Sequence, residues 1–312
     1  MAYLFPQATI RHLVSGEFWL GSISREAESE PSRLKANPIT PEILENEEAV
    51  GQAQLEEIQR AAAGKAGDLV IILLGGRGAQ AMYRLVGRMA ETSSLDSLLS
   101  RLHVFTQDAL APLRMDNGLS FVRDFERLLG DAFFRKIKSF TPMRTDTDSP
   151  ENELIRYTEK LESLGGIDIF FLGLGPEPGA ASHLAYIKPG SGATSTDIAG
   201  VIPISSSILE HHINKFKVGG STVTDADEAE CRAATQIMTL GPAAILGARR
   251  IVQSIVDADT APAKRESYRR VLKTALSEDS TERAAQLDAN PGLWLRLHPN
   301  VRSLVLPDVL AA

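Results

Sequence analysis

Cysteine, clustered basic residues and long hydrophobic runs are all scarce in this sequence. A single cysteine among 312 residues, Cys231, excludes an intrachain disulfide and a cysteine-based zinc site, and it fits a reducing compartment. The net charge is -7 at pH 7 without the clustered Lys and Arg that neutralise phosphates, so we expect no nucleic-acid partner. The longest apolar run, LVIILL, is far too short for a membrane span, and the first residues lack a signal-peptide pattern. We therefore expect a cytoplasmic protein without a membrane partner.

Motifs for bound cofactors are missing as well. The glycine-rich segment LLGGRGAQAMYRL contains neither G-x-x-x-x-G-K-[ST] nor G-x-G-x-x-G, which excludes the two best-known nucleotide loops. His211 and His212 are adjacent but have no third ligand at metal spacing. We expect neither a metal nor an organic cofactor.

What the sequence does contain is an alternation of apolar strands and amphipathic helices. The segments DLVIILLGGRG, LHVFTQDAL and IDIFFLGLG each predict a buried strand, and helical patterns lie between them. This order predicts an α/β fold in three layers, a mostly parallel sheet with helices on both faces. We divide the chain into an N-terminal extension, residues 1–40, on the surface, and one domain, residues 41–312, that opens with a helix from Pro41 to Gly64.

Ligands of parallel sheets bind beyond the carboxyl ends of the strands, so three strand ends are candidate site segments. The first is a glycine turn before a helix, which offers backbone N–H groups to a phosphate or is a tight turn that binds nothing. At the second, Asp108 follows an apolar strand as a candidate general base or a helix cap. The three segments are Gly75–Ala79, Gln107–Asp108 and Gly173–His183.

Six segments, in this order and over roughly residues 45 to 310, carry a family resemblance. They are GGRGAQAMY, FTQDAL, GLGPEPGAASHLAYIKPGS, IMTLGPAAILGARRIV, PAKRESY and LRLHPNVRSLVLPD. Their order resembles that of the glucosamine-6-phosphate deaminase family (glucosamine/galactosamine-6-phosphate isomerases). This family shares its Rossmann-like fold with 6-phosphogluconolactonases and ribose-5-phosphate isomerases, and the resemblance implies a sugar phosphate as the small-molecule partner. It leaves open whether the chain forms a homo-oligomer.

The resemblance also implies a role for each matched residue. Asp108 falls on the general base that moves a proton between C1 and C2 of the open sugar, and His183 falls on the histidine that assists ring opening. The phosphate would be held by one lysine, by a histidine near the position of an arginine, and by the glycine loop. These residues are Lys264, His212, Gly75, Gly76, Arg77 and Gly78.

The motif around His183 departs from the family pattern. The acid before the histidine is missing unless Glu177 takes its place, and Lys188 stands where the family has the glutamate that orients the histidine. We expect this lysine to favour the neutral form of His183. Three functions follow as expectations: a divergent sugar-phosphate isomerase or deaminase, a 6-phosphogluconolactonase-like hydrolase, and a non-catalytic sugar-phosphate sensor.

Overall fold

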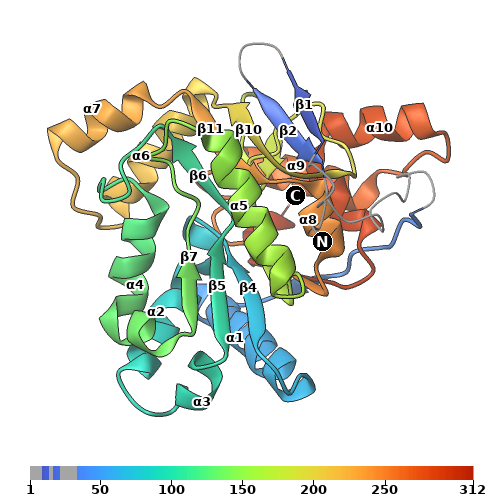
Figure 1. Cartoon of the computed structure of the whole chain (residues 1–312). Helices are drawn as coiled ribbons and strands as arrows, with labels where there is room; N and C mark the ends of the chain where they lie inside the picture. Colours follow the sequence, from blue (N-terminus) through green and yellow to red (C-terminus); the bar gives the residue numbers. More distant parts are fainter. Residues whose placement is uncertain (1–8, 14–16, 22–33, 312) are drawn as a thin grey trace, which may run out of the picture.

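The computed structural model describes residues 9–13, 17–21 and 34–311, which form an α/β fold with two sheets (Figure 1). The larger sheet has the order β3-β13-β12-β8-β4-β5-β7, and every neighbouring pair along it is parallel. Its central strands are the apolar runs of the sequence, buried because both faces of the sheet are covered. The strands are β3 (Pro41–Ile43), β13 (Val301–Val305), β12 (Arg250–Ile255), β8 (Ile169–Pro176), β4 (Leu69–Leu73), β5 (Leu102–Thr106) and β7 (Ser139–Thr141).

Helices lie on both sides of the parallel strands, which confirms the predicted layering. In Figure 1, α5 lies in front of β4 and β5, whereas α1 and α2 lie behind them. On one side of the sheet, α1 packs against α2, and α2 packs against α4. The helices are α1 (Glu47–Gly64), α2 (Gln80–Ala90), α3 (Asp96–Leu99), α4 (Phe121–Lys136), α5 (Pro150–Ser163), α6 (Ser206–Val218), α7 (Asp225–Ala233), α8 (Pro242–Gly247), α9 (Pro262–Lys273) and α10 (Ser280–Ala289). Short 3₁₀ turns are η4 (Arg77–Ala79), η5 (Pro291–Leu297) and η6 (Pro307–Val309).

The prediction of one helix from Pro41 to Gly64 is wrong at its start. Residues Pro41–Ile43 pair in parallel with β13 as an edge strand, and the helix begins only at Glu47. Asn46 caps it by accepting a hydrogen bond from the backbone N–H of Ala49, which fixes the helix start at that point.

A second, antiparallel sheet is the main feature that the sequence patterns did not predict. Its order is β1-β2-β10-β11-β6, with β1 (Ile10–His12), β2 (Phe18–Gly21), β10 (Asp197–Pro203), β11 (Gln236–Leu240) and β6 (Asp108–Ala111). The segment LHVFTQDAL, expected as one strand, is therefore split at Gln107 into β5 of the parallel sheet and β6 of this one.

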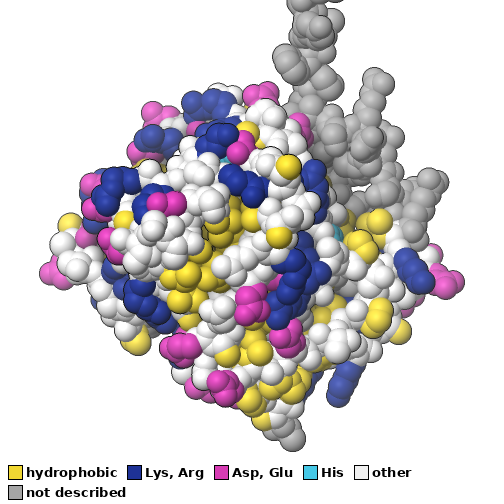
Figure 2. Space-filling view, turned by 90° about the horizontal axis from the view of Figure 1, so that it is seen from below, with side chains coloured by type: hydrophobic (Ala, Val, Ile, Leu, Met, Phe, Trp, Pro, Cys, Tyr) yellow, Lys and Arg dark blue, Asp and Glu magenta, His cyan; other side chains and the backbone are white. Residues whose placement is uncertain are grey.

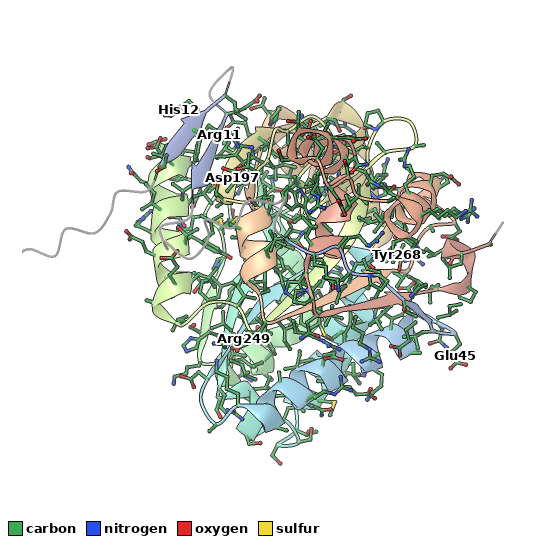
Figure 3. The ribbon with its side chains drawn as sticks, turned by 90° about the vertical axis from the view of Figure 1, so that its right-hand side faces the viewer. Arg11, His12, Glu45, Asp197, Arg249 and Tyr268 are labelled. Carbon is green, nitrogen blue, oxygen red and sulfur yellow. The ribbon has the colours of Figure 1, made fainter. Side chains whose placement is uncertain are left out.

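The N-terminal segment enters the same sheet. Part of the predicted extension lies outside the described residues, but β2 pairs with β10, and Trp19 and Leu20 are fully buried. The expected surface position is thus wrong for β2. An ion pair from Arg11 on β1 to Asp197 at the start of β10 ties the hairpin to the domain (Figure 3).

The surface mixes charges of both signs. Figure 2 shows lysine, arginine and acidic side chains interspersed on one face, with hydrophobic side chains gathered near its middle. Among the described residues, none of the helices combines the length and the apolar character needed to cross a membrane.

Candidate active site

A pocket lies at the carboxyl ends of β4, β8 and β12, and we call it the inner pocket. Its empty volume, which includes space open to solvent, is about 640 Å³. Segments far apart in the sequence line it: the glycine loop 75–78, residues 173–175, His183 and Tyr186, part of α6, and Lys264 on α9. Of the residues singled out from the sequence, the inner pocket brings together Gly75, Gly76, Arg77, Gly78, His183, His212 and Lys264.

The glycine loop is held from two sides. The backbone carbonyl of Gly78 accepts hydrogen bonds from the Ser254 hydroxyl at 2.9 Å and from the Gln54 amide at 3.1 Å. A side chain at Gly78 would have its Cβ only 2.8 Å from the same hydroxyl, so the close approach requires glycine. Arg77 donates to Glu47 of α1, at 2.6 and 2.9 Å. The loop is thereby fixed at the rim of the pocket.

Two lysines share one buried carboxylate on the wall of the inner pocket. The Lys264 ammonium donates to Asp257 Oδ1 at 2.7 Å, and the Lys215 ammonium donates to Asp257 Oδ2. Asp257 is 2% exposed and Lys264 8% exposed, so this group of charges is largely shielded from water. Burial lowers the pKa of Lys264, and the cation of Arg77 adds to the effect. A bound anion would raise the pKa of Lys264 again, because a nearby opposite charge favours the ammonium form.

Lys215 and Asp257 are the residues that the sequence reasoning missed. Lys215 lies one helical turn after His211, so both face the pocket from α6. That spacing was visible in the sequence. Asp257 closely follows β12, and an acid after an apolar strand is the signal that had singled out Asp108.

His183 lies on a β-hairpin. The strand β9 (Ser182–Leu184) pairs antiparallel with the end of β8, and the register sets His183 opposite Gly175. Residues 177–181, which begin with Glu177, form the turn of this hairpin. His183 is 6% exposed, and its Nδ1 is buried without a hydrogen-bond partner among the described residues.

Burial lowers the pKa of His183 well below its ordinary value, and the charges of Lys264 and His211 add to this shift. The imidazole is therefore neutral at physiological pH. The neutral form was expected, but its expected cause, Lys188, is not the one the structure shows.

Gly175 leaves the space that the His183 ring fills. A Cβ built on Gly175 would lie 1.5 Å from His183 Nε2, far inside van der Waals contact. We expect Gly175→Ala to displace the imidazole and to lower turnover of any substrate at least tenfold. Enzyme assays check this, with Gly64→Ala as the control, since nothing lies within 4 Å of that site. Wild-type activity in Gly175→Ala would remove His183 from the reaction.

A strained turn follows the histidine. Ala185 and Tyr186 have φ angles of 49° and 54°, a conformation that favours glycine or asparagine. Leu184 and Ile187 close the turn with two backbone hydrogen bonds, and the Thr239 hydroxyl donates to the carbonyl of Ala185. The turn places the Tyr186 ring 4.2 Å from that of His183. Such strain is characteristic of functional loops.

Asp108 lies in a neighbouring pocket, which we call the side pocket. This pocket and the inner pocket share Phe121 and His212 as a common wall. Gln107 faces the inner pocket and donates its amide N–H to Asp108 Oδ2, while Oδ1 has no partner among the described residues. Burial raises the pKa of Asp108 to about 7. A carboxyl group with such a pKa can take up and release protons near neutral pH.

Glu177 and Lys188 are not among the described residues that line the inner pocket. Glu177 accepts a hydrogen bond from Ser205 at 3.1 Å, and burial raises its pKa despite the Ser205 hydrogen bond and the charge of Lys188. His212 packs against Phe121 in the wall between the inner and side pockets. Its Nε2 lies 2.7 Å from the carbonyl of Leu119. The described residues contain no cluster of histidine, cysteine and acidic side chains suited to a metal ion.

The fold and pocket together define an α/β protein whose small-molecule site offers lysines, a glycine loop and a neutral histidine. Residues 45–287 match the family described as "Glucosamine-6-phosphate isomerases/6-phosphogluconolactonase", and the chain belongs to this family. Its members are sugar-phosphate enzymes.

Curated relatives at modest identity are deaminases. The chain is 26% identical to glucosamine-6-phosphate deaminase 1 of Bacillus subtilis over 243 residues, 76% of this chain and 85% of that protein. It is 38% identical to the glucosamine-6-phosphate deaminase of Bacteroides thetaiotaomicron over 86 residues, 24% of this chain and only 30% of that protein.

Solved structures of both activities share the fold. A monomeric glucosamine-6-phosphate deaminase superposes with a TM-score of 0.63 at 21% identity, covering 87% of this chain and 98% of that one. The 6-phosphogluconolactonase of Trypanosoma brucei superposes with a TM-score of 0.60 at 19% identity, covering 89% of this chain and 100% of that one.

Proposed function

We propose that this protein isomerises or deaminates a hexose 6-phosphate, glucosamine 6-phosphate or a close relative, in carbohydrate metabolism. The observation that carries the proposal is the convergence of Lys264, His183 and the loop 75–78 on one pocket. An ammonium group and backbone N–H groups suit a phosphate, and a neutral imidazole within the same pocket suits a proton acceptor for the sugar.

In the proposed reaction the phosphate lies between the glycine loop and the two lysines. His183 takes the proton of the C1 hydroxyl and returns it to the ring oxygen as the C1–O5 bond breaks, and Asp108 moves a proton between C1 and C2. For this second step Asp108 must reach the inner pocket, so Gln107 and Phe121 must move aside from the wall between the pockets. Glu177 supplies the acid missing beside His183 only if the 177–181 turn closes over the site.

A second candidate function is hydrolysis of a phosphorylated sugar lactone. The unpartnered Nδ1 and neutral state of His183 favour it, because a base that activates water needs no second carboxylate in the inner pocket. The third candidate, a sensor, would bind sugar phosphates without turning them over.

One experiment separates the three candidates. Wild type and His183→Ala are assayed with glucosamine 6-phosphate, by ketose phosphate and ammonia release, and with 6-phosphogluconolactone, by acid release. We expect turnover of the aminosugar phosphate in the wild type and a loss of about 10²-fold or more in the variant. Turnover of the lactone alone would establish the hydrolase. Binding of the phosphates by thermal shift, with no product in either assay, would establish the sensor.

A further inference from the structure

A second pocket, here the outer pocket, adjoins the inner pocket. The two share Gly76, Arg77, His211, Lys215 and Phe216. Three of these shared residues belong to the glycine loop or to the lysine pair, the groups assigned to the phosphate. The outer pocket therefore begins at the phosphate end of the inner pocket and not at the His183 end, where the sugar would react.

The outer pocket carries excess positive charge. Arg77, Arg84 and Lys215 are the basic residues of its lining, and Glu47 is the acidic one; burial lowers the pKa of Lys215 to about 7. Glu47 pairs with Arg77, and Lys215 pairs with the inner carboxylate Asp257. Arg84 is exposed and takes part in no ion pair within the described part of the chain. Its charge remains available to a ligand.

Two amide side chains line the outer pocket together with Arg84. Gln80 precedes it by one turn on α2 and donates one amide N–H to Asp124 Oδ2 at 3.3 Å, which leaves the other N–H for a ligand. Asn214 lines the same pocket from α6. These helices approach each other here, since a Cβ built on Gly219 would lie 3.8 Å from Gln80 Nε2. Guanidinium and amide N–H groups on facing helices are suited to the oxygen atoms of a phosphoryl group.

We propose that the outer pocket binds a second phosphoryl group, so that this chain takes ligands with two linked phosphates, one phosphate in each pocket. Because the pockets meet at the phosphate end, a group that extends into the outer pocket is attached to the first phosphate. This defines the ligand class as diphosphates and their esters, and it rests on the phosphate site of the proposed function.

Inorganic phosphate and inorganic pyrophosphate, in metal-free buffer with EDTA, test the proposal by calorimetry. We expect the wild type to bind pyrophosphate at least tenfold more tightly than phosphate. Arg84→Ala should lower the pyrophosphate affinity about fivefold and change the phosphate affinity less than twofold. Arg88→Ala is the matched control, an exposed arginine one turn further along α2 and outside the lining of the outer pocket.

Two results would overturn the inference. One is equal affinity of the wild type for the two anions, and the other is an equal loss of pyrophosphate affinity in Arg84→Ala and Arg88→Ala, which reports general charge only. The calorimetry distinguishes this failure from failure of the proposed function. If phosphate and hexose 6-phosphates bind through Lys264 but pyrophosphate binds no more tightly than phosphate, only the second phosphoryl site is wrong. If neither anion binds, both proposals fail.

Discussion

Asp108→Asn is expected to lower turnover of glucosamine 6-phosphate by about 10²- to 10⁴-fold while sugar-phosphate binding persists. An asparagine keeps the shape of the side chain but cannot accept the proton that moves between C1 and C2. Burial raises the pKa of Asp108 to about 7, so kcat/KM of the wild type should rise with pH through that value. The residual activity of the variant should lack this rise. An unchanged rate in Asp108→Asn would contradict the isomerase mechanism and favour the hydrolase.

The same substitution has a stability signature that does not depend on activity. The pKa of Asp108 is 3.8 in ordinary surroundings and about 7 in the folded chain. Since the folded state holds the proton more tightly, the protonated carboxyl supports folding below pH 3.8, and that support is lost as pH rises to 7. Between pH 5 and 8 the wild type should lose about 3 kcal/mol of unfolding free energy through this group.

Asp108→Asn should remove this loss, because the amide does not titrate. Urea unfolding of both proteins at pH 5 and pH 8 measures the difference. Comparing each protein with itself at the two pH values cancels the cost of burying the amide. Equal pH dependence of wild type and variant would mean that the pKa of Asp108 is not raised.

Lys264→Met is expected to weaken binding of any hexose 6-phosphate tenfold or more. The variant loses the ammonium on the inner pocket wall, but Lys215 still neutralises Asp257, so the fold should persist. Titration calorimetry with the hexose phosphate and with the unphosphorylated hexose measures the effect, which should be confined to the phosphorylated ligand.

The matched control is Lys217→Met. Lys217 lies on α6 two residues after Lys215 but is exposed and pairs with Glu228 on the surface. Its removal changes the net charge by the same amount without touching the inner pocket. Equal losses of affinity in the two variants would assign the effect to overall charge and take Lys264 out of the phosphate site.

The parallel sheet and the glycine loop were predictable because their signals are local. Runs such as LVIIL and IFFL are buried on both faces of the sheet, and their hydrophobicity marks them as strands without knowledge of the partners. Once the strands are known to be parallel, their carboxyl ends gather at one edge. That rule was sufficient to select the loop 75–78 and His183.

The antiparallel sheet was not predictable from such signals. The strand β6 continues the apolar run of β5, and only its pairing with β11, over a hundred residues later, assigns it to another sheet. The same change of sheet separates Gln107 from Asp108: the first faces the inner pocket and the second the side pocket. Sequence motifs place both residues at one strand end and do not distinguish their surroundings.

The sequence by itself determined the α/β class, the strand ends that line the inner pocket and the family to which the chain belongs. Only the tertiary structure decided which charges meet there: Lys215 and Lys264 on Asp257, and Lys264 rather than Lys188 beside His183. The physical reason is the distance over which each effect acts. Burial and helical or strand periodicity act between near neighbours along the chain, whereas a pKa or an ion pair depends on distances in space. Those distances are set when residues such as Lys215 and Asp257, 42 positions apart, pack against each other.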